Sequence, residues 1–562
     1  MQSDRINHMQ RAIIPDRILP ALLLIDGLVS IAFAIFAHAM GFDPNPDWGR
    51  SRFVLLFIGS FLVAISLFLF QKKPAFITSE ILKSAILLAH LWAIIVAVYA
   101  WFITFGTFTE WRASTRYYTL LADAFGKGQL HVDVEPGAAL LAADDPYSSE
   151  GRPGFEDEVW DLSLYHGKLY LYWGPVPALL LTPIQRFIQQ PIADIYLVFL
   201  FLCGLLIFNS LFILKVWRSF FPDIAVWHVV LSIFLIGLIL PILWSLNIPD
   251  VYEAAIGAGQ FFLVGGIYFA VLAFEQDIRK RFLFLAGFFW ACSVGSRAIN
   301  VLPIFFLTAL TLFWIWKKQP KPLQWMKITR FAAALIVPLA LGALLIGWYN
   351  WARFDSPFEF GLRYQITIYN LNRDMPLTFQ LDYLPFNFVA YLLQPFEFIT
   401  KFPFIQPVEF SDLLSSLGIN APKLYAAGRV TGILFYAPIL LFAFIPFLKK
   451  DGEKNGQSEL KLYVLYLLGG SFLISFITLL CYFYGQMRFM LDMISQVTLL
   501  AIMGYWSLAH KSKPSKALLI TANFFIIITL ATSLLLAFTS ESSRMERLNP
   551  ELMDRLNSFF VR

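Results

Sequence analysis

The sequence predicts an all-α protein that crosses a membrane many times. Of its 562 residues, 58% are hydrophobic and 14% are charged, and the mean hydropathy is +0.66. Apolar surface on this scale cannot all be buried in the core of a soluble domain. Apolar stretches that could cross the roughly 30 Å hydrocarbon core of a bilayer recur along the chain. We therefore expect a single integral membrane domain over residues 1–562.

About thirteen segments have the length and composition of membrane helices. Two neighbouring segments are short enough to form a tight hairpin that does not fully cross, 282–295 and 300–316. The approximate spans are 18–39, 53–70, 84–105, 193–214, 225–245, 257–276, 282–295, 300–316, 331–349, 430–448, 462–482, 490–508 and 517–538.

The distribution of Lys and Arg predicts the orientation. With the N-terminus in the cytoplasm, basic residues are roughly threefold denser in the inner connections than in the outer ones, as the positive-inside rule requires. Two large polar loops, 106–192 and 350–429, then lie outside. The C-terminal tail, 539–562, also lies outside, and its apolar stripe at helical spacing predicts an amphipathic helix on the membrane surface.

An aromatic stretch at 160–177, W-D-L-S-L-Y-H-G-K-L-Y-L-Y-W-G-P-V-P, stands out in the first loop. Leucines alternate with polar residues or tyrosines on either side of His166-Gly167, which predicts a small β-hairpin. One interpretation is a cap that only packs on the helices, and the other is part of a catalytic loop. On the second interpretation it carries a candidate base, a phosphate-binding lysine and two substrate-binding rings: Asp161, Lys168, Trp160 and Tyr172.

Carboxylates are frequent in the first loop. A carboxylate at an outer membrane surface can act as a general base or hold a divalent cation such as Mg²⁺ or Mn²⁺. No spacing here is a metal signature, and for any single acid a solvated loop position or helix capping is the alternative role. The loop also carries an acidic run at 156–158. The candidates for the catalytic base are Asp133, Asp161 and Asp123, while Asp144 and Asp145 precede a proline turn and look solvent-facing.

A second acidic pair precedes the segment at 257–276. Pro249 suits the start of a helix, and Asp250 and Glu253 then lie one turn apart on one face. They either place favourable charge at a helix N-terminus or face the same outer cavity as the first loop, where they would bind substrate.

Three arginines from distant parts of the sequence map to the outer face, Arg297, Arg363 and Arg488. Guanidinium groups suit phosphate or diphosphate, so these are candidates for binding a lipid phosphate, with Tyr364 beside them as a substrate contact. For Arg297 the alternative is snorkelling to the interface. Ionisable residues in the middle of the apolar segments are few, Asp26 and His90 being the clearest, which weighs against an ion-coupled transporter.

Several of these stretches resemble a known family. R-Y-Y-T-L-L-A-D-A-F-G-K-G, from Arg116, is similar to the Arg-Tyr-x-x-x-Ala helix of the bacterial GT-C superfamily of polyprenyl-phosphate-sugar-dependent glycosyltransferases, which includes protein mannosyltransferases and aminoarabinose transferases. G-K-L-Y-L-Y-W-G-P-V-P-A-L-L-L-T-P resembles the loop segment that leads into the family's next helix. D-S-P-F-E-F-G-L-R-Y-Q, from Asp355, resembles a stretch of bacterial membrane proteins grouped with them.

The sequence departs from the family pattern at one important place. The family has an Asp-Glu pair just before Arg-Tyr, and here those positions hold Ser114 and Thr115. The family's catalytic acid therefore cannot be carried over to this position, and a base would have to come from another carboxylate.

The resemblance implies a GT-C-like fold and transfer of a sugar from a polyprenyl-phosphate donor to a glycan, lipid or protein acceptor. It implies a site at the outer face of the bacterial cytoplasmic membrane, in contact with membrane lipids and without a nucleic-acid partner. The alternative from another class is a non-enzymatic transporter of lipid-linked saccharides, or a cell-envelope assembly protein.

Overall fold

The computed structural model describes residues 17–37, 49–71, 80–113, 115–150, 159–188, 191–320, 322–448, 456–510, 515–540 and 544–560. Ser114 and the acidic run 156–158 lie outside the described residues. The chain divides into two compact units, Met1–Ala97 with Pro222–Val230, and Val98–Phe221 with Leu231–Arg562.

In the first unit, two apolar helices form a close pair, α2 (Ile18–Phe36) and α3 (Arg50–Gln71). A glycine in each allows the approach: a Cβ on Gly27 would lie 2.7 Å from the carbonyl oxygen of Gly59, and the reverse is also true. The next helix is α4 (Glu80–Ile103), whose His90 Nε2 lies 2.5 Å from Asp26 Oδ2. The two ionisable residues predicted inside apolar segments therefore pair with each other.

Among the described residues, ten helices are long and apolar enough to cross a membrane, or up to eleven if one bent pair counts as a span. The bent pair is α9 (Val226–Leu238) and α10 (Leu240–Asn247), which turns by 41° before Pro241. The break leaves the backbone N–H of Leu240 without a helical partner, and it donates to Ser533 Oγ at 3.1 Å.

Two of the thirteen predicted segments are not spanning helices in this structure. Residues 433–448 form three short pieces, α18 (Ile433–Tyr436), the 3₁₀ helix η8 (Pro438–Phe444) and α19 (Ile445–Leu448), because Pro438 interrupts the apolar run. The helix α12 (Lys280–Val294) has 15 residues, too few to span. It leads through a 3₁₀ turn, η3 (Ala298–Asn300), into α13 (Val301–Lys317).

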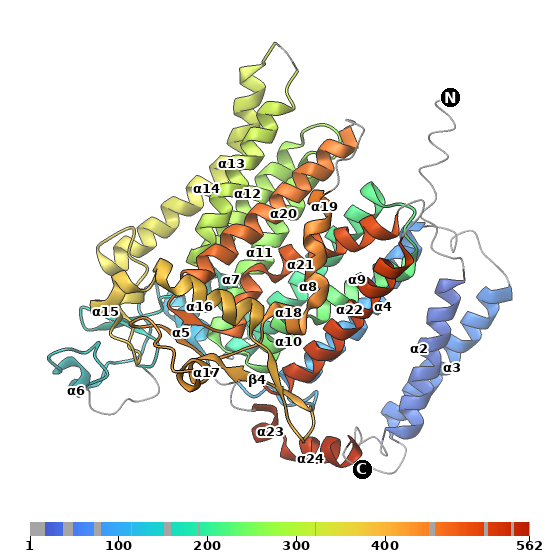
Figure 1. Cartoon of the computed structure of the whole chain (residues 1–562), viewed down its shortest axis with the longest axis horizontal. Coiled ribbons are helices and arrows are strands. Elements are labelled where there is room, and N and C mark those ends of the chain that lie inside the picture. The colour runs from blue at the N-terminus through green and yellow to red at the C-terminus, as the bar shows by residue number, and fades with distance from the viewer. Residues whose placement is uncertain are drawn as a thin grey trace. The chain divides into compact units, whose positions relative to one another are not determined.

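The second unit is built around two buried helices, α11 (Val251–Ala273) and α21 (Leu491–Ala509) (Figure 1). Every residue of α21 from Leu491 to Leu508 is buried, although the helix includes polar residues such as Asp492 and Gln496. The helices packed around this pair are α8 (Asp194–Phe220), α12, α13, α20 (Gly456–Leu480) and α22 (Lys516–Ala537). The helix α14 (Trp325–Phe354) packs on α12 and α13.

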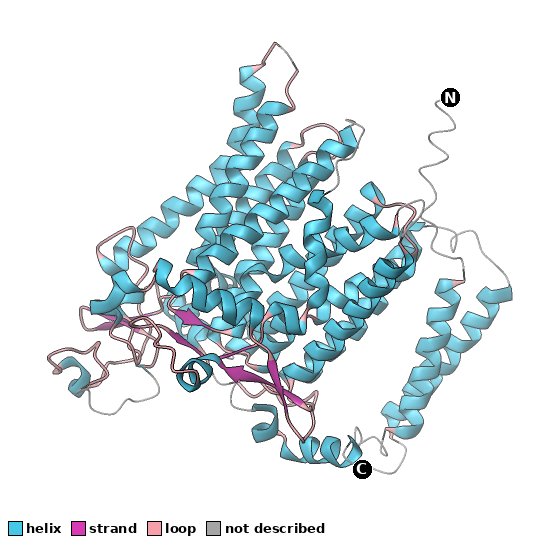
Figure 2. Cartoon of the chain, in the orientation of Figure 1, coloured by secondary structure: helices cyan, strands magenta, loops and turns pink. Residues whose placement is uncertain are grey.

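The strands of the second unit gather at one end of its long helices, which we call the loop face (Figure 2). The predicted hairpin is confirmed: β1 (Ser163–Tyr165) pairs with β2 (Lys168–Tyr170), and the turn residues His166 and Gly167 have φ of 47° and 72°. A second, three-stranded sheet has the order β3 (Phe396–Phe398), β4 (Ile405–Glu409) and β6 (Arg429–Val430). Separately, β5 (Ala426–Ala427) pairs in parallel with β7 (Tyr484–Gly485).

Short helices complete the loop face. In the first loop, the helix expected from the Arg116 motif is present as α5 (Tyr117–Gly126). It is followed by the single turn α6 (Ala138–Leu141) and by the proline-containing α7 (Val176–Ile188). In the second loop, an apolar helical run covers Leu381–Leu393. The other short helices are η4 (Leu362–Tyr364), α15 (Leu371–Asp374), η5 (Met375–Leu377) and α17 (Phe410–Ser416). The chain ends in α23 (Arg544–Leu548) and α24 (Pro550–Phe560).

Candidate functional site

The two large loops join at Asp161. Its backbone N–H donates to the Ile366 carbonyl at 2.9 Å, and the Ile366 N–H donates back to the Leu162 carbonyl at 2.8 Å. One residue on, Ser163 forms an isolated bridge with Gln365. The hairpin of the first loop therefore continues into the second loop, and this pairing fixes the position of Asp161.

The Asp161 carboxyl group is buried, with 4% of the residue exposed. Its Oδ1 accepts a hydrogen bond from Gln365 Nε2 at 2.6 Å. Burial raises the pKa of Asp161 to about 7, although the nearby Arg488 guanidinium and the hydrogen bonds from Gln365 and Trp160 act in the opposite direction. The residue also has a φ of 62°, a left-handed conformation that is uncommon outside glycine and that persists only where the surroundings impose it. Near neutral pH this carboxyl group can therefore both accept and release a proton.

Arg488 brings positive charge to Asp161 from the start of the α21 region. It lies on a 3₁₀ turn, η9 (Met487–Met490), and its side chain is 11% exposed. The Nη1 atom lies 3.7 Å from Oε1 of Glu253, and the guanidinium carbon lies 4.1 Å from the centre of the Tyr252 ring. Glu253 and Tyr252 are in the first turn of α11, so a helix terminus and an ion pair together position this arginine.

Arg297 forms a second and tighter ion pair. Its Nε lies 3.0 Å from both carboxylate oxygens of Asp492, and its Nη2 lies 2.7 Å from Oδ2. The Asp492 side chain is 2% exposed and that of Arg297 is 17% exposed. This geometry makes snorkelling toward solvent the wrong interpretation for Arg297, because its guanidinium is directed to a buried carboxylate.

Both arginines converge on the same aromatic residues. Each guanidinium carbon lies 5.5 Å from the centre of the Phe489 ring. Burial raises the pKa of Tyr172 well above its ordinary value; Asp161 adds to this rise, and Arg488 and Arg297 oppose it. Tyr172 therefore lies within electrostatic range of all three charged groups. We call Asp161, Tyr172, Arg297, Arg488 and Glu253, with Asp492, the charged cluster.

A neighbouring set of contacts supports the cluster from the side of α5. The Asp194 carboxylate accepts hydrogen bonds from Thr115 Oγ1 at 2.7 Å, from the Tyr117 N–H at 2.9 Å and from the Tyr118 N–H at 3.0 Å. It thus satisfies the free N–H groups at the start of α5 from the start of a different helix, α8. The Val251 N–H donates to the same Thr115 hydroxyl at 3.0 Å, which ties α11 to this junction.

Sequence reasoning did not select Asp194 or Asp492 as site residues. Each is a single carboxylate in the first turn of an otherwise apolar helix. Burying an isolated carboxylate in a membrane helix costs free energy unless the carboxylate has a partner. An acid in an apolar helix therefore indicates a polar partner, and this signal could have identified both residues.

The remaining predicted site residues lie elsewhere on the loop face. Asp133 is exposed and pairs with Lys127 and Gln129, and Asp123 is exposed on α5. Lys168 is exposed on the hairpin, and Arg363 is 44% exposed and pairs with Glu359 at 3.4 Å.

Tyr364 and Asp250 also have partners outside the cluster. The Tyr364 ring packs on Tyr165 and Phe354. Asp250 precedes α11 and lies 3.3 Å from Nη1 of Arg544, so it and Glu253 contact different arginines. Trp160 adjoins Asp161, and its carbonyl accepts from the Tyr117 hydroxyl at 2.6 Å.

Within the described ranges, no group of three or more His, Cys, Asp or Glu residues is arranged to hold a metal ion.

The fold and the cluster define a polytopic α-helical membrane protein with a charged site where polar loops meet the ends of its helices. No protein-family model matches the sequence, and no curated protein matches it. Similar solved structures are those of an oligosaccharyltransferase from Archaeoglobus fulgidus. The apo form has 13% identity and a TM-score of 0.43, covering 79% of this chain and 56% of that one.

Two further structures of that enzyme give similar values. The form tethered to an acceptor peptide has 12% identity and a TM-score of 0.43, covering 81% of this chain and 56% of that one. The complex with an inhibitory peptide and a dolichol-phosphate has 13% identity and a TM-score of 0.39, covering 80% and 55%. This chain thus spans about half the length of the proteins it matches, and its function has to be inferred from its own residues.

Proposed function

We propose that the protein transfers a glycosyl group from a polyprenyl-phosphate-linked donor to an acceptor hydroxyl at the membrane surface that carries its loop face. The observation that supports this most directly is Asp161. It is a buried carboxyl group with a pKa of about 7, held between the two loops within electrostatic range of Arg488. A general base works best when its pKa lies near the working pH.

In this proposal Asp161 accepts the proton of the acceptor hydroxyl. The acceptor oxygen then attacks the anomeric carbon of the donor sugar, and the bond between that carbon and the phosphate oxygen breaks. The electron pair of that bond leaves with the lipid phosphate. A single displacement of this kind inverts the anomeric configuration.

Arg488 is the proposed partner of the leaving phosphate. Its guanidinium lies within electrostatic range of Asp161, so it can offset negative charge on the phosphate oxygen as the bond to the sugar breaks. Arg297 makes close contacts with Asp492 and is proposed to position the site by holding the end of α12 against α21. Stabilisation of the charge that develops on a leaving group usually makes one of the largest contributions to catalysis.

The aromatic residues beside Asp161 suit a sugar. The Trp173 ring packs edge-on against Tyr252 at 5.2 Å, which joins the hairpin to α11, and Tyr172 lies 4.2 Å from Trp173. Trp160 and Tyr172 are the proposed stacking surfaces for the transferred sugar, because aromatic faces bind the apolar faces of carbohydrate rings.

The test is transfer by the purified full-length protein in lipid nanodiscs, supplied with radiolabelled polyprenyl-phosphate sugars and hydroxyl-bearing acceptors. We expect the release of one polyprenyl phosphate for each sugar transferred. This activity should be lost in Asp161→Asn and kept in Asp144→Asn, which removes an exposed carboxylate from the same loop. Movement of the intact donor across the bilayer without cleavage would instead assign the protein to the lipid-linked saccharide transporters.

A further inference from the structure

A cavity of about 280 Å³ lies apart from the charged cluster, beneath the C-terminal helices. Three segments form it: the loop between β3 and β4, the residues that follow α22, and the pair α23–α24. The volume is slightly below the range of about 300–1,000 Å³ that is usual for small-molecule sites, and it fits a group the size of a lipid headgroup.

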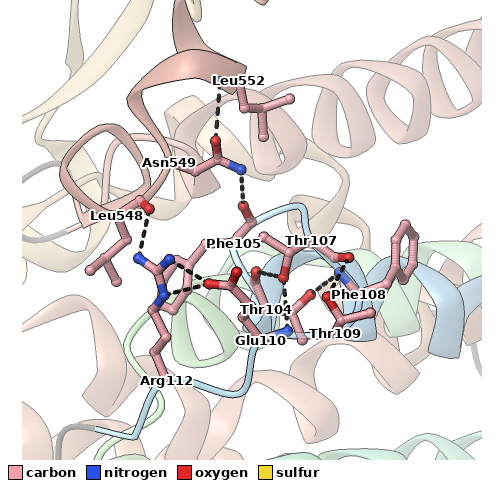
Figure 3. Close-up of polar contacts among 10 residues, drawn as sticks. All are labelled: Thr104, Phe105, Thr107, Phe108, Thr109, Glu110, Arg112, Leu548, Asn549 and Leu552. Atoms are coloured by element: carbon pink, nitrogen blue, oxygen red, sulfur yellow. Dashed lines mark hydrogen bonds and ion pairs between the residues drawn. The ribbon is translucent and has the colours of Figure 1, made fainter. Parts of the chain in front are cut away.

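The C-terminal helices are held in place by polar contacts with the segment that follows α4 (Figure 3). Asn549 Nδ2 donates to the Phe105 carbonyl at 2.8 Å, while its Oδ1 accepts from the Leu552 N–H at 3.1 Å and caps α24. Arg112 Nη1 donates to the Leu548 carbonyl at 2.9 Å. These hydrogen bonds therefore hold α23 and α24, which line one side of the cavity, against the rest of the second unit.

The β3–β4 loop is fixed to the same helices. The Phe402 N–H donates to Asn557 Oδ1 at 2.7 Å, and the Phe402 ring stacks on Phe560 with centroids 5.2 Å apart. The open cavity is thus lined by a loop and a helix that contact each other directly.

Two opposite charges line the cavity, Lys401 and Glu546. Within the described part of the chain, neither side chain takes part in an ion pair, and they do not pair with each other. Both residues are exposed. A ligand that carries one negative and one positive group can therefore contact both, with Thr400 and Gln406 as further polar neighbours.

The cavity lies at the end of a candidate membrane-spanning helix. Phe538 and Thr539, which line it, directly follow the candidate spanning helix α22. On α24 the side of Met553 is buried, while Phe559 and Phe560 are 73% and 51% exposed. Large exposed aromatic residues on a short amphipathic helix suit the boundary between headgroups and acyl chains.

We propose that this cavity binds the headgroup of a phospholipid that carries both a phosphate and a primary ammonium, as phosphatidylethanolamine does. The Lys401 ammonium contacts the phosphate, and the Glu546 carboxylate accepts hydrogen bonds from the lipid ammonium. The site is separate from sugar transfer and does not depend on the proposed function.

The test uses the purified full-length protein in detergent, after removal of bound lipid. Phosphatidylethanolamine, phosphatidylcholine and phosphatidylglycerol with identical acyl chains are titrated separately, and bound lipid is counted by native mass spectrometry. We expect phosphatidylethanolamine to bind at least about tenfold more tightly than the other two, because only it satisfies both charges with hydrogen bonds.

The variants assign the site. Glu546→Gln should remove the preference for phosphatidylethanolamine over phosphatidylglycerol, and Lys401→Gln should weaken both of these lipids. Glu551→Gln is the matched control, because it removes an exposed carboxylate from α24, where Glu551 faces Arg555 instead of the cavity.

Three results would overturn the proposal. One is equal binding of the three lipids by the unmodified protein, a measurement that needs no variant to fold. Another is the same effect from Glu546→Gln and Glu551→Gln. The third is displacement of bound lipid by a free disaccharide, which would assign the cavity to a glycan.

Discussion

Arg488 Nη1 lies 3.7 Å from Glu253 Oε1, and this ion pair connects the starts of α11 and α21, the two most buried of the candidate membrane-spanning helices. The Glu253 side chain is 1% exposed. A carboxylate at this depth needs a cation, and an arginine at this depth needs an anion. The pair therefore keeps a guanidinium group within range of Asp161, where an isolated arginine would be too costly to bury.

Replacing Arg488 tests its proposed role toward the leaving phosphate. We expect Arg488→Gln to lower kcat by about 10²- to 10³-fold, the usual effect of losing one group that stabilises developing negative charge. Arg488→Lys keeps the positive charge but lacks the planar guanidinium group, so its kcat should lie between that of the unmodified protein and that of Arg488→Gln. Steady-state kinetics with the donor varied provide the measurement.

The control is Arg373→Gln, which replaces an exposed arginine of the second loop and should leave kcat unchanged. Equal kcat in Arg488→Gln and Arg373→Gln would remove Arg488 from the site.

Asp161→Asn tests the base. The amide keeps the size of the side chain but cannot take the proton of the acceptor, so we expect a loss of about 10²- to 10⁴-fold in rate. Asp133→Asn should retain most of the activity, because Asp133 is exposed and ion-paired with Lys127. The measurement is sugar transfer by each folded variant, with folding checked by size-exclusion chromatography. Loss in Asp133→Asn with retention in Asp161→Asn would reverse this assignment.

The pH dependence of transfer follows from the raised pKa of Asp161. Only the ionised carboxylate can accept a proton, so kcat/KM should rise with pH up to about 7 and then level off. If the rate were already independent of pH between 5 and 8, the base would be a carboxylate with an ordinary pKa.

The same shift makes a prediction about stability. The pKa of Asp161 in the folded protein lies above its ordinary value of 3.8, so the folded state binds the proton more tightly than the unfolded state does. Ionisation of Asp161 therefore lowers stability progressively as pH rises from about 4 to about 7. Asp161→Asn has no carboxyl group to ionise at this position. The thermal unfolding temperature of this variant, relative to that of the unmodified protein, should therefore increase as pH rises through this range.

Much of the helical layout could be predicted from the sequence, because long apolar runs and glycine-proline turns are local signals. The hairpin at His166-Gly167 was predictable for the same reason. The break before α10 and the short pieces around Pro438 were not, since a broken helix is stable only where tertiary contacts such as Ser533 satisfy the freed backbone.

The candidate site was predictable only in part. Asp161, Tyr172, Arg297, Arg488 and Glu253 were all named from sequence, and the structure brings them together. Which carboxylate is buried could not be predicted, because burial of Asp161 depends on pairing with Ile366 in a loop that is distant in the sequence. Likewise, the partner of Arg297 follows from the tertiary fold, which brings the turn after α12 to the first turn of α21, and not from any local motif.

The orientation of the membrane segments is tested by labelling. The distribution of Lys and Arg predicts that the loop face is outside the cytoplasm. A cysteine introduced at Ser149, an exposed position in the first loop, should react with an impermeant thiol reagent in intact cells, and one at Ser458, before the apolar part of α20, should react only after lysis. The opposite pattern would place the site on the cytoplasmic side and exclude an externally facing donor.

Asp492→Asn tests whether the Arg297–Asp492 pair holds the site together. The substitution leaves the Arg297 guanidinium without its carboxylate beside the buried helix α21, and breaking a buried ion pair from one side typically costs about 3–5 kcal/mol. We expect a clear fall in thermal unfolding temperature, measured in detergent by intrinsic tryptophan fluorescence.

A second variant separates a lost ion pair from simple damage to the fold. Arg297→Gln/Asp492→Asn removes both charges and should recover part of the lost stability, because two amides can hydrogen-bond where one unpaired guanidinium cannot be solvated. Asp382→Asn, an exposed carboxylate of the second loop, provides the control and should unfold as the unmodified protein does. If the effects of the two substitutions were simply additive, the double variant would be less stable than Asp492→Asn, and the two residues would not act as a pair. Arg297 would then have to be stabilised by the Phe489 ring instead.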